Sequence, residues 1–80
     1  MNINQFNLHN IKNGSICVKI ANNYEAQIEN YKGIVEYSSK KIVIEGKNIR
    51  LCVEGCNLSI AYYTNDEMKI SGTICSVKYL

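Results

Sequence analysis

The sequence feature that most constrains the fold is a change in which positions are apolar along residues 41–80. Apolar and polar side chains alternate over short stretches, which is the period of a half-buried β-strand. The apolar positions are even-numbered up to Gly46, odd-numbered up to Gly55, even-numbered again up to Gly72, and odd-numbered beyond it. A shift of one residue turns a whole strand over, so each glycine must provide a turn or bulge if one face is to stay buried.

Other turn residues divide the rest of the chain in the same way. Strands are predicted near residues 16–20, 24–29, 34–38, 41–45, 49–54, 58–63, 67–71 and 74–79. Strands this short and regularly interrupted predict an all-β fold, namely a small antiparallel meander, roll or partly open barrel of seven to eight short strands. A Glu-Gly-x-Asn turn at residues 45–48 returns at residues 54–57, so a short β-solenoid-like stack is the alternative, although such arrays need three or more repeats.

The segment from Ile28 to Tyr37 predicts a hairpin. Asn30 suits the first position of a type I turn, and Gly33 suits the closing position because glycine accepts a positive φ without steric cost. The substitution Gly33→Val is therefore expected to strain the backbone. The structural turn residues expected from the sequence are Asn30, Gly33, Gly46, Gly55 and Gly72.

The chain length of 80 residues predicts a single domain. Residues 1–14 are polar and rich in asparagine, and they are expected to form a mostly irregular N-terminal arm before one β domain at residues 15–80. The start of the chain has no basic flank and no apolar run, and no stretch reaches about 20 apolar residues, so neither a signal peptide nor a transmembrane segment is expected. A cytoplasmic location with free thiols is the resulting expectation.

No constellation of residues predicts catalysis or metal binding. His9 is the only histidine and has no partner that would make it a general base. Cys52 and Cys56 have a spacing found in zinc sites, but a structural site needs a second such pair. The strand pattern also points Cys75 inward and Cys52 outward. These two thiols are therefore not expected to join Cys17 around one metal ion. We expect a protein that is not an enzyme and holds no metal or cofactor.

The surface residues favour contacts with proteins. Tyr24, Tyr62 and Tyr79 share the inward positions and are expected in the core or at its rim, whereas Tyr31 and Tyr63 are expected to face outward. Exposed aromatic side chains suit protein contacts as well as base stacking, and the net charge of +2 is spread along the chain, so no nucleic acid is expected. The expected interaction surface consists of Tyr31, Lys32, Tyr63, Val77 and Lys78.

Strands 16–20 and 74–79 are expected to be the edges of the sheet. The chain has no proline to block pairing at these edges. Because a chain of this length buries a small core, association would also stabilise it. The sequence thus predicts self-association, or addition of a partner strand, through Ile74 to Tyr79.

Several segments, in order and with matching spacing, resemble the YabP/YqfC-like sporulation proteins of endospore-forming Firmicutes, and the YqfC branch in particular. The matching segments are IENYKGI at residues 28–34, the Glu36-Tyr37 strand end, KIVI at residues 41–44, G-x-N-L-x-I at residues 55–60, YYTNDE at residues 62–67, I-x-G-x-I at residues 70–74, and VKY at residues 77–79. The resemblance covers roughly residues 15 to 80.

This resemblance implies a small sporulation protein without catalytic residues. We expect a structural or protein-interaction module in the cytoplasm of the mother cell during endospore formation. Its partner is expected to be a second copy or a membrane-associated sporulation protein, which leaves recruitment to the forespore surface or to a membrane partner open. A small β module that binds single-stranded nucleic acid is the alternative function.

Overall fold

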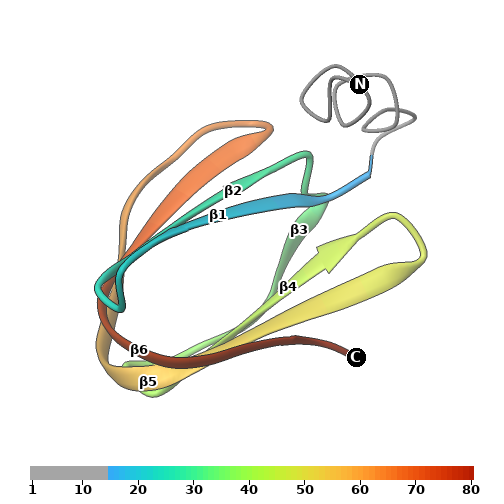
Figure 1. Ribbon diagram of the computed structural model, residues 1–80. Helices are drawn as coiled ribbons and strands as arrows, with labels where there is room; N and C mark the ends of the chain where they lie inside the picture. The colour runs from blue at the N-terminus through green and yellow to red at the C-terminus, as the bar shows by residue number, and fades with distance from the viewer. Residues whose placement is uncertain (1–14) are drawn as a thin grey trace, which may run out of the picture.

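The computed structural model describes residues 15–80, which form one antiparallel sheet of six strands and no helix (Figure 1). The expected irregular arm at residues 1–14 lies outside the described residues. The strands are β1 (Cys17–Ala21), β2 (Glu25–Glu29), β3 (Gly33–Tyr37), β4 (Lys41–Gly46), β5 (Ile49–Tyr63) and β6 (Glu67–Tyr79). The all-β prediction is confirmed. Two pairs of predicted strands, 49–54 with 58–63 and 67–71 with 74–79, are each one continuous strand, so the count is lower than predicted.

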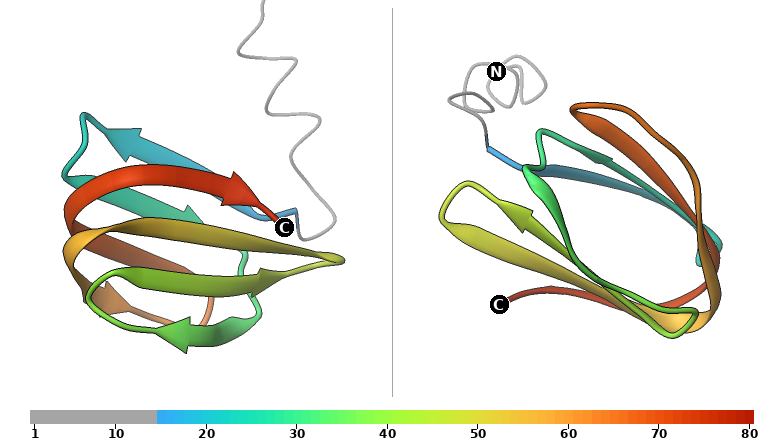
Figure 2. Two further views of the ribbon diagram at one scale, coloured as in Figure 1. Left: turned by 90° about the horizontal axis from the view of Figure 1, so that it is seen from below. Right: turned by 180° about the vertical axis from the view of Figure 1, so that it is seen from behind.

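The strand order is β1-β2-β6-β5-β4-β3, and every neighbouring pair is antiparallel. The long strands β5 and β6 both bend near their middle, which folds the sheet over itself (Figures 1 and 2). We call the two halves the first and second layers. The first layer contains β1, β2, the first half of β6 and the second half of β5. The second layer contains the second half of β6, the first half of β5, β4 and β3.

Two glycines make the bend possible. The register of β5 against β6 shifts between Glu54 and Gly55 and again between Cys56 and Ser59. A Cβ atom on Gly55 would lie 1.9 Å from the carbonyl oxygen of Thr73, so only glycine fits where β5 comes this close to the backbone of β6. Gly72 is also crowded by the opposite strand, since an added Cβ atom would lie 2.5 Å from the Asn57 carbonyl oxygen, and its φ of +133° is rarely adopted by other residues. Gly46, in contrast, ends β4 just before the turn at residues 47–48.

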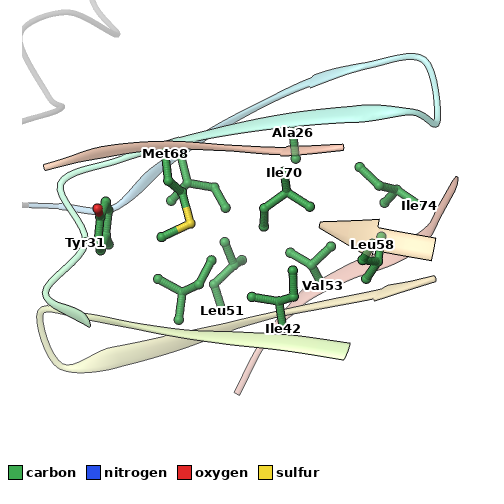
Figure 3. Packing of buried hydrophobic residues seen from close by; sticks show 11 residues of the cluster. Ala26, Tyr31, Ile42, Leu51, Val53, Leu58, Met68, Ile70 and Ile74 are labelled. Atoms are coloured by element: carbon green, nitrogen blue, oxygen red, sulfur yellow. The ribbon is translucent and has the colours of Figure 1, made fainter. Parts of the chain in front are cut away.

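The core lies between the two layers and is entirely apolar (Figure 3). It consists of Ala26, Ile28, Tyr31, Ile42, Ile44, Leu51, Val53, Leu58, Met68, Ile70 and Ile74. Isoleucine, valine and leucine at alternate positions of β2, β4, β5 and β6 supply most of it, as expected for strands with one buried face. No buried side-chain nitrogen or oxygen among the described residues lacks a hydrogen-bond partner.

The three tyrosines expected in the core or at its rim are all exposed, and for Tyr24 and Tyr62 this corrects the sequence interpretation. Tyr62 follows a register shift after Ile60 that turns its side chain outward, where its hydroxyl accepts a hydrogen bond from Gln27 Nε2 at 3.4 Å. Tyr24 lies in the turn between β1 and β2. Tyr79 is at the last position of β6, at the rim of the core.

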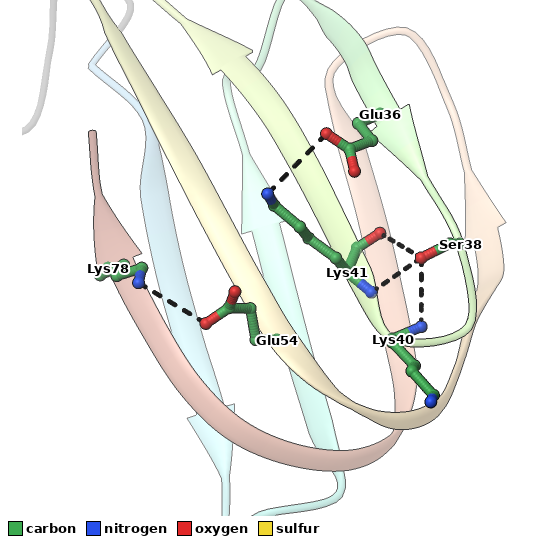
Figure 4. A network of polar contacts seen from close by, with 6 residues as sticks. All are labelled: Glu36, Ser38, Lys40, Lys41, Glu54 and Lys78. Atoms are coloured by element: carbon green, nitrogen blue, oxygen red, sulfur yellow. Dashed lines mark hydrogen bonds and ion pairs between the residues drawn. The ribbon is translucent and has the colours of Figure 1, made fainter.

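Two further apolar residues are buried on the outer face of the second layer, which points away from the core. Val43 and Cys52 are paired across β4 and β5 and are both buried, although their side chains alternate with those that face the core. Ion pairs lie along the same face, with Lys41 4.0 Å from Glu36 and Lys78 3.6 Å from Glu54 (Figure 4). Cys52 therefore points away from the core as expected but is not accessible.

Cys75 was expected to face the core, yet its side chain is exposed. The register pairs Glu54 with Ser76 and Gly55 with Ile74, so Cys75 is the extra residue of a bulge in β6. The bulge lets both Ile74 and Val77 face the core on either side of it.

Candidate protein-interaction surface

The bent sheet leaves two sides open between its layers. Within residues 15–80, the first open side lies between β1, which pairs only with β2, and the second half of β6, which pairs only with β5. In the same part of the chain, the second open side lies between β3, which pairs only with β4, and the second half of β5, which pairs only with β6. Backbone hydrogen bonds close each side at the bend: Ile74 N–H to Asn23 C=O at 2.6 Å, and Leu58 N–H to Ser39 C=O at 2.8 Å.

At the mouth of the second open side, the link between β2 and β3 crosses from one layer to the other. Asn30 donates its N–H to Asp66 C=O at 2.8 Å on the first layer, and Lys32 donates its N–H to Glu45 C=O at 2.7 Å on the second. Asn30 adopts a positive φ of 63°, a conformation that asparagine tolerates better than most residues. These bonds hold Tyr31, between them, in a fixed position.

Tyr31 fills the space behind this link. Its side chain is only 7% exposed, and its hydroxyl donates a hydrogen bond to the Thr64 carbonyl oxygen. The centre of its ring is 6.3 Å from that of Tyr63 at a tilt of 51°, a favourable arrangement for two aromatic rings. Burial, and to a lesser extent the nearby Tyr63 and Asp66, raises the pKa of Tyr31 above its usual value of 10.0. The neutral hydroxyl therefore persists as the donor to Thr64.

A shallow groove of about 370 Å³ lies in front of Tyr31. It is lined by Tyr31, Lys32, Gly33 and Ile34 on one side and by Tyr63, Thr64 and Asn65 on the other. Tyr63 is 61% exposed and Lys32 is also exposed, so the groove presents an aromatic ring and a cation to solvent. Such a groove offers apolar and charged contacts to a chain segment.

A family model of the YabP family matches residues 12–80. The chain belongs to the YabP family. The family-level resemblance is thereby confirmed, while the match does not separate the YqfC branch from the rest. Membership in the YabP family indicates a sporulation-related protein. No curated protein and no solved structure matches the chain.

In this YabP-family chain, the five residues of the expected interaction surface fall in two places. Tyr31, Lys32 and Tyr63 meet at the groove of the second open side. Val77 packs against the core from β6, and Lys78 lies on the outer face with Glu54. Tyr31 was expected to point outward, and this was wrong, because the link between the layers turns its ring into the core.

Gly33 also differs from its expected role. The residue with a positive φ in this turn is Asn30, and Gly33 instead begins β3. A Cβ atom on Gly33 would meet nothing within 4 Å. The expectation that Gly33→Val strains the backbone through a positive φ is therefore wrong.

Residues 15–80 of this YabP-family chain hold no group of three or more histidine, cysteine or acidic side chains placed to bind a metal ion. Cys17 is partly exposed, Cys52 is buried, and Cys56 and Cys75 are exposed. The same residues contain no helix that could cross a membrane. His9 lies outside the described residues. The groove and the open strand edges are the features of residues 15–80 that could contact a partner.

The sequence interpretation missed Ile34, Thr64 and Asn65 as neighbours of the groove. Thr64 and Asn65 fall between the strands expected at residues 58–63 and 67–71, and Ile34 begins the strand expected at residues 34–38. Their proximity depends on the bend of β5 and β6, which brings the β5–β6 turn next to the start of β3. No local pattern in the sequence reports that contact.

Proposed function

We propose that this YabP-family protein is a non-enzymatic sporulation protein that acts by binding another protein at the second open side. The observation that carries the proposal is the groove in which Tyr63 and Lys32 are exposed beside a buried, hydrogen-bonded Tyr31. Because Tyr31 is already held in place beneath the exposed side chains, the groove loses less conformational entropy when a partner binds. Tyrosine is also enriched at protein interfaces.

The strand edges beside the groove support the same function. No strand of the described chain neighbours the second half of β5 or β3 on this side, so their backbone groups can pair with an added strand. A register shift between Ile34 and Glu36 makes β3 irregular, and irregular edges resist unspecific pairing. The edge of β5 next to Tyr63 is therefore the better site for a specific strand.

The compartment and the partner are part of the proposal, and the family's link to sporulation supports them. A sporulation protein of this kind would act in the cytoplasm of the mother cell, with a partner that is membrane-associated or a second copy. The proposal assigns no catalytic residue, because the groove holds no acid or base pair that would transfer a proton.

A photo-crosslinking amino acid at position 63 tests the proposal in sporulating cells. The matched control places the same amino acid at position 24, because Tyr24 is also exposed but lies in the turn between β1 and β2. We expect a crosslinked protein from position 63, identified by mass, that is absent from position 24 and is lost when Lys32→Glu is added. Identical products from both positions, or none from position 63, would contradict the proposal.

A further inference from the structure

The first open side is a wedge between two strand edges of the same molecule. Its narrow end is the hydrogen bond from Ile74 N–H to Asn23 C=O, and its wide end lies between the start of β1 and the end of β6 (Figure 1). Hollows of about 260 Å³ and 330 Å³ lie near the two ends, and each is lined by residues from both edges. Among the described residues, β1 pairs only with β2, and β6 from Cys75 onward pairs only with β5.

The backbone of β1 directs hydrogen-bonding groups into this wedge. The carbonyl oxygen of Ala21 accepts a hydrogen bond from Tyr24 N–H at 3.3 Å within the β1–β2 turn, so Ala21 faces β2. Backbone groups of successive residues point to opposite sides of an antiparallel strand. The N–H and C=O groups of Val18 and Ile20 therefore point into the wedge. The register of β1 against β2 is unbroken, so this wall is regular.

The backbone of β6 does the same from the other wall. Leu80 donates its N–H to Arg50 C=O at 2.8 Å, so Leu80 faces β5. By the same alternation, Val77 and Tyr79 direct their backbone groups away from β5 and into the wedge. The wedge thus has backbone donors and acceptors along both walls.

The side chains on the core side of the wedge are apolar. They are Ile16, Val18 and Ile20 from β1 and Ile74, Val77 and Tyr79 from β6. Ile20 is 48% exposed, a large fraction for an isoleucine on the core-facing side of a strand. A strand that enters the wedge would place every second side chain against these residues, so apolar side chains suit those positions.

The solvent side of the wedge carries positive charge. Lys19 on β1 and Lys78 on β6 are both exposed, and each alternates with core-facing residues of its strand. Lys19 is four residues before Asn23 in the chain, and Lys78 is four residues after Ile74. Because Asn23 and Ile74 are bonded at the narrow end, the two cations flank the wedge at similar distances from that end.

No acidic residue balances these cations on either wall. Residues 15–21 and 74–80 contain no aspartate or glutamate. Among the described residues Lys19 has no ion pair, and Lys78 reaches Glu54 at 3.6 Å on the β5 side, away from the wedge. An ion pair this exposed is weak, so both lysines can contact a carboxylate between the walls.

We infer that the wedge binds an extended segment of another protein, with apolar and acidic side chains at alternate positions. The two edges of that segment pair with the backbones of β1 and β6, its apolar side chains face the core, and its carboxylates lie between Lys19 and Lys78. Because β1 has five residues, a segment of about five residues spans the wedge.

A second folded copy does not fit this site. A strand that pairs with both walls has no edge left for a sheet of its own. Each of the six described strands is already paired along at least one edge. The occupant is therefore a segment with two free edges.

This inference goes beyond the proposed function, because it concerns the opposite side of the sheet. It also gives a partner chemistry to the strand addition that the sequence predicts at Ile74 to Tyr79. Failure of either proposal leaves the other intact, because Lys19 and the wedge amides test this one, whereas Tyr63 and Lys32 test the proposed function.

A synthetic peptide of seven residues with capped ends tests the inference on the full chain. It has valine at its second, fourth and sixth positions and glutamate at the others. The wedge amides are those of Val18, Ile20, Val77 and Tyr79. We expect their hydrogen exchange, followed by NMR, to be fast in the free protein and to slow at least about tenfold with saturating peptide. A control peptide with its three valines before its four glutamates cannot place them on one face, and it should leave these amides fast.

The substitution Lys19→Glu tests the charge. Because attraction becomes repulsion, the Kd of the alternating peptide should rise about fivefold. The matched variant Lys40→Glu makes the same change of charge in the turn between β3 and β4, and it should leave the Kd unchanged. Slow exchange at Ile70, in the core, verifies that each variant is folded.

Several outcomes would overturn the inference. They are no binding of the alternating peptide, equal effects of the two peptides, and equal effects of the two lysine substitutions. Slow exchange of the wedge amides before peptide is added would show that the wedge is already filled. Protection that rises with protein concentration would assign it to a second copy. Protection by the peptide at Ile60, beside the second open side, in place of the wedge amides would also overturn the inference.

Discussion

At the scale of single residues, we expect an added methyl group to lower the free energy of unfolding most at Gly55 and Gly72, the two glycines of the bend. In Gly55→Ala the new Cβ would overlap the Thr73 carbonyl, and in Gly72→Ala it would lie 2.5 Å from the Asn57 carbonyl. We expect each variant to lower the free energy of unfolding by about 2 kcal/mol or more, because backbone must move. Gly33→Ala, with open space around it, should stay within about 0.5 kcal/mol of the parent. Urea unfolding measures all three, and equal losses would contradict the assignment.

Tyr31 gives the chain a pH dependence in the alkaline range. Its pKa is raised above 10.0 in the folded state, so the folded state holds the proton more tightly than the unfolded state. The stability that this contributes is fully present below pH 10 and decreases as the pH rises from there through the folded pKa. Tyr31→Phe removes this contribution and the hydrogen bond to Thr64, at a cost of about 1 kcal/mol at neutral pH.

The difference in unfolding free energy between the parent and Tyr31→Phe should therefore shrink above pH 10. Thermal unfolding at pH 7, 9 and 10.5 measures it, with Tyr24→Phe as a control that removes an exposed tyrosine. A difference that grows with pH would contradict the direction given for Tyr31.

At the scale of elements, the outer face of β4 and β5 protects one thiol and leaves others open. Cys52 is 1% exposed beside Val43, whereas Cys56 and Cys75 are exposed near the bend. Alkylation requires contact between thiolate and reagent, so we expect Cys56 and Cys75 of the native protein to react first. Cys52 should react only after unfolding in urea. Mass spectrometry of digested protein gives the order, and early modification of Cys52 would show that this face opens.

At the scale of the whole molecule, the lysines and exposed tyrosines of the described residues are spread over the sheet, and from this we predict that they form no nucleic-acid platform. Lys41, Lys69 and Lys78 each lie within 4.0 Å of a glutamate, and the exposed tyrosines Tyr24 and Tyr63 lie on different parts of the sheet. We expect titration with single-stranded oligonucleotide to show no tight binding at low salt. Binding that weakens steeply with salt would favour the nucleic-acid alternative.

The apolar face of β6 changes at the Cys75 bulge and not at Gly72 as expected, because Ile74 still faces the core. The sequence by itself determined the all-β class and most strand boundaries. Those features depend on neighbouring residues, since alternation has a period of two and Gly55 interrupts it locally. Only the tertiary structure decided that β5 and β6 continue through their bends. The reason is that the course of these strands depends on pairing between residues far apart in the sequence, such as Ile28 in β2 and Met68 in β6.

The candidate site likewise depends partly on the local sequence and partly on the tertiary structure. Tyr63 and Lys32 could be named from composition and strand position, but the groove exists because the bend brings the β5–β6 turn to the start of β3. Tyr31 has the same alternation signal as an exposed tyrosine, and its burial follows from a link that is hydrogen-bonded to both layers. A contact between layers is set by how two distant bends fold the sheet, and that geometry has no local pattern in the chain.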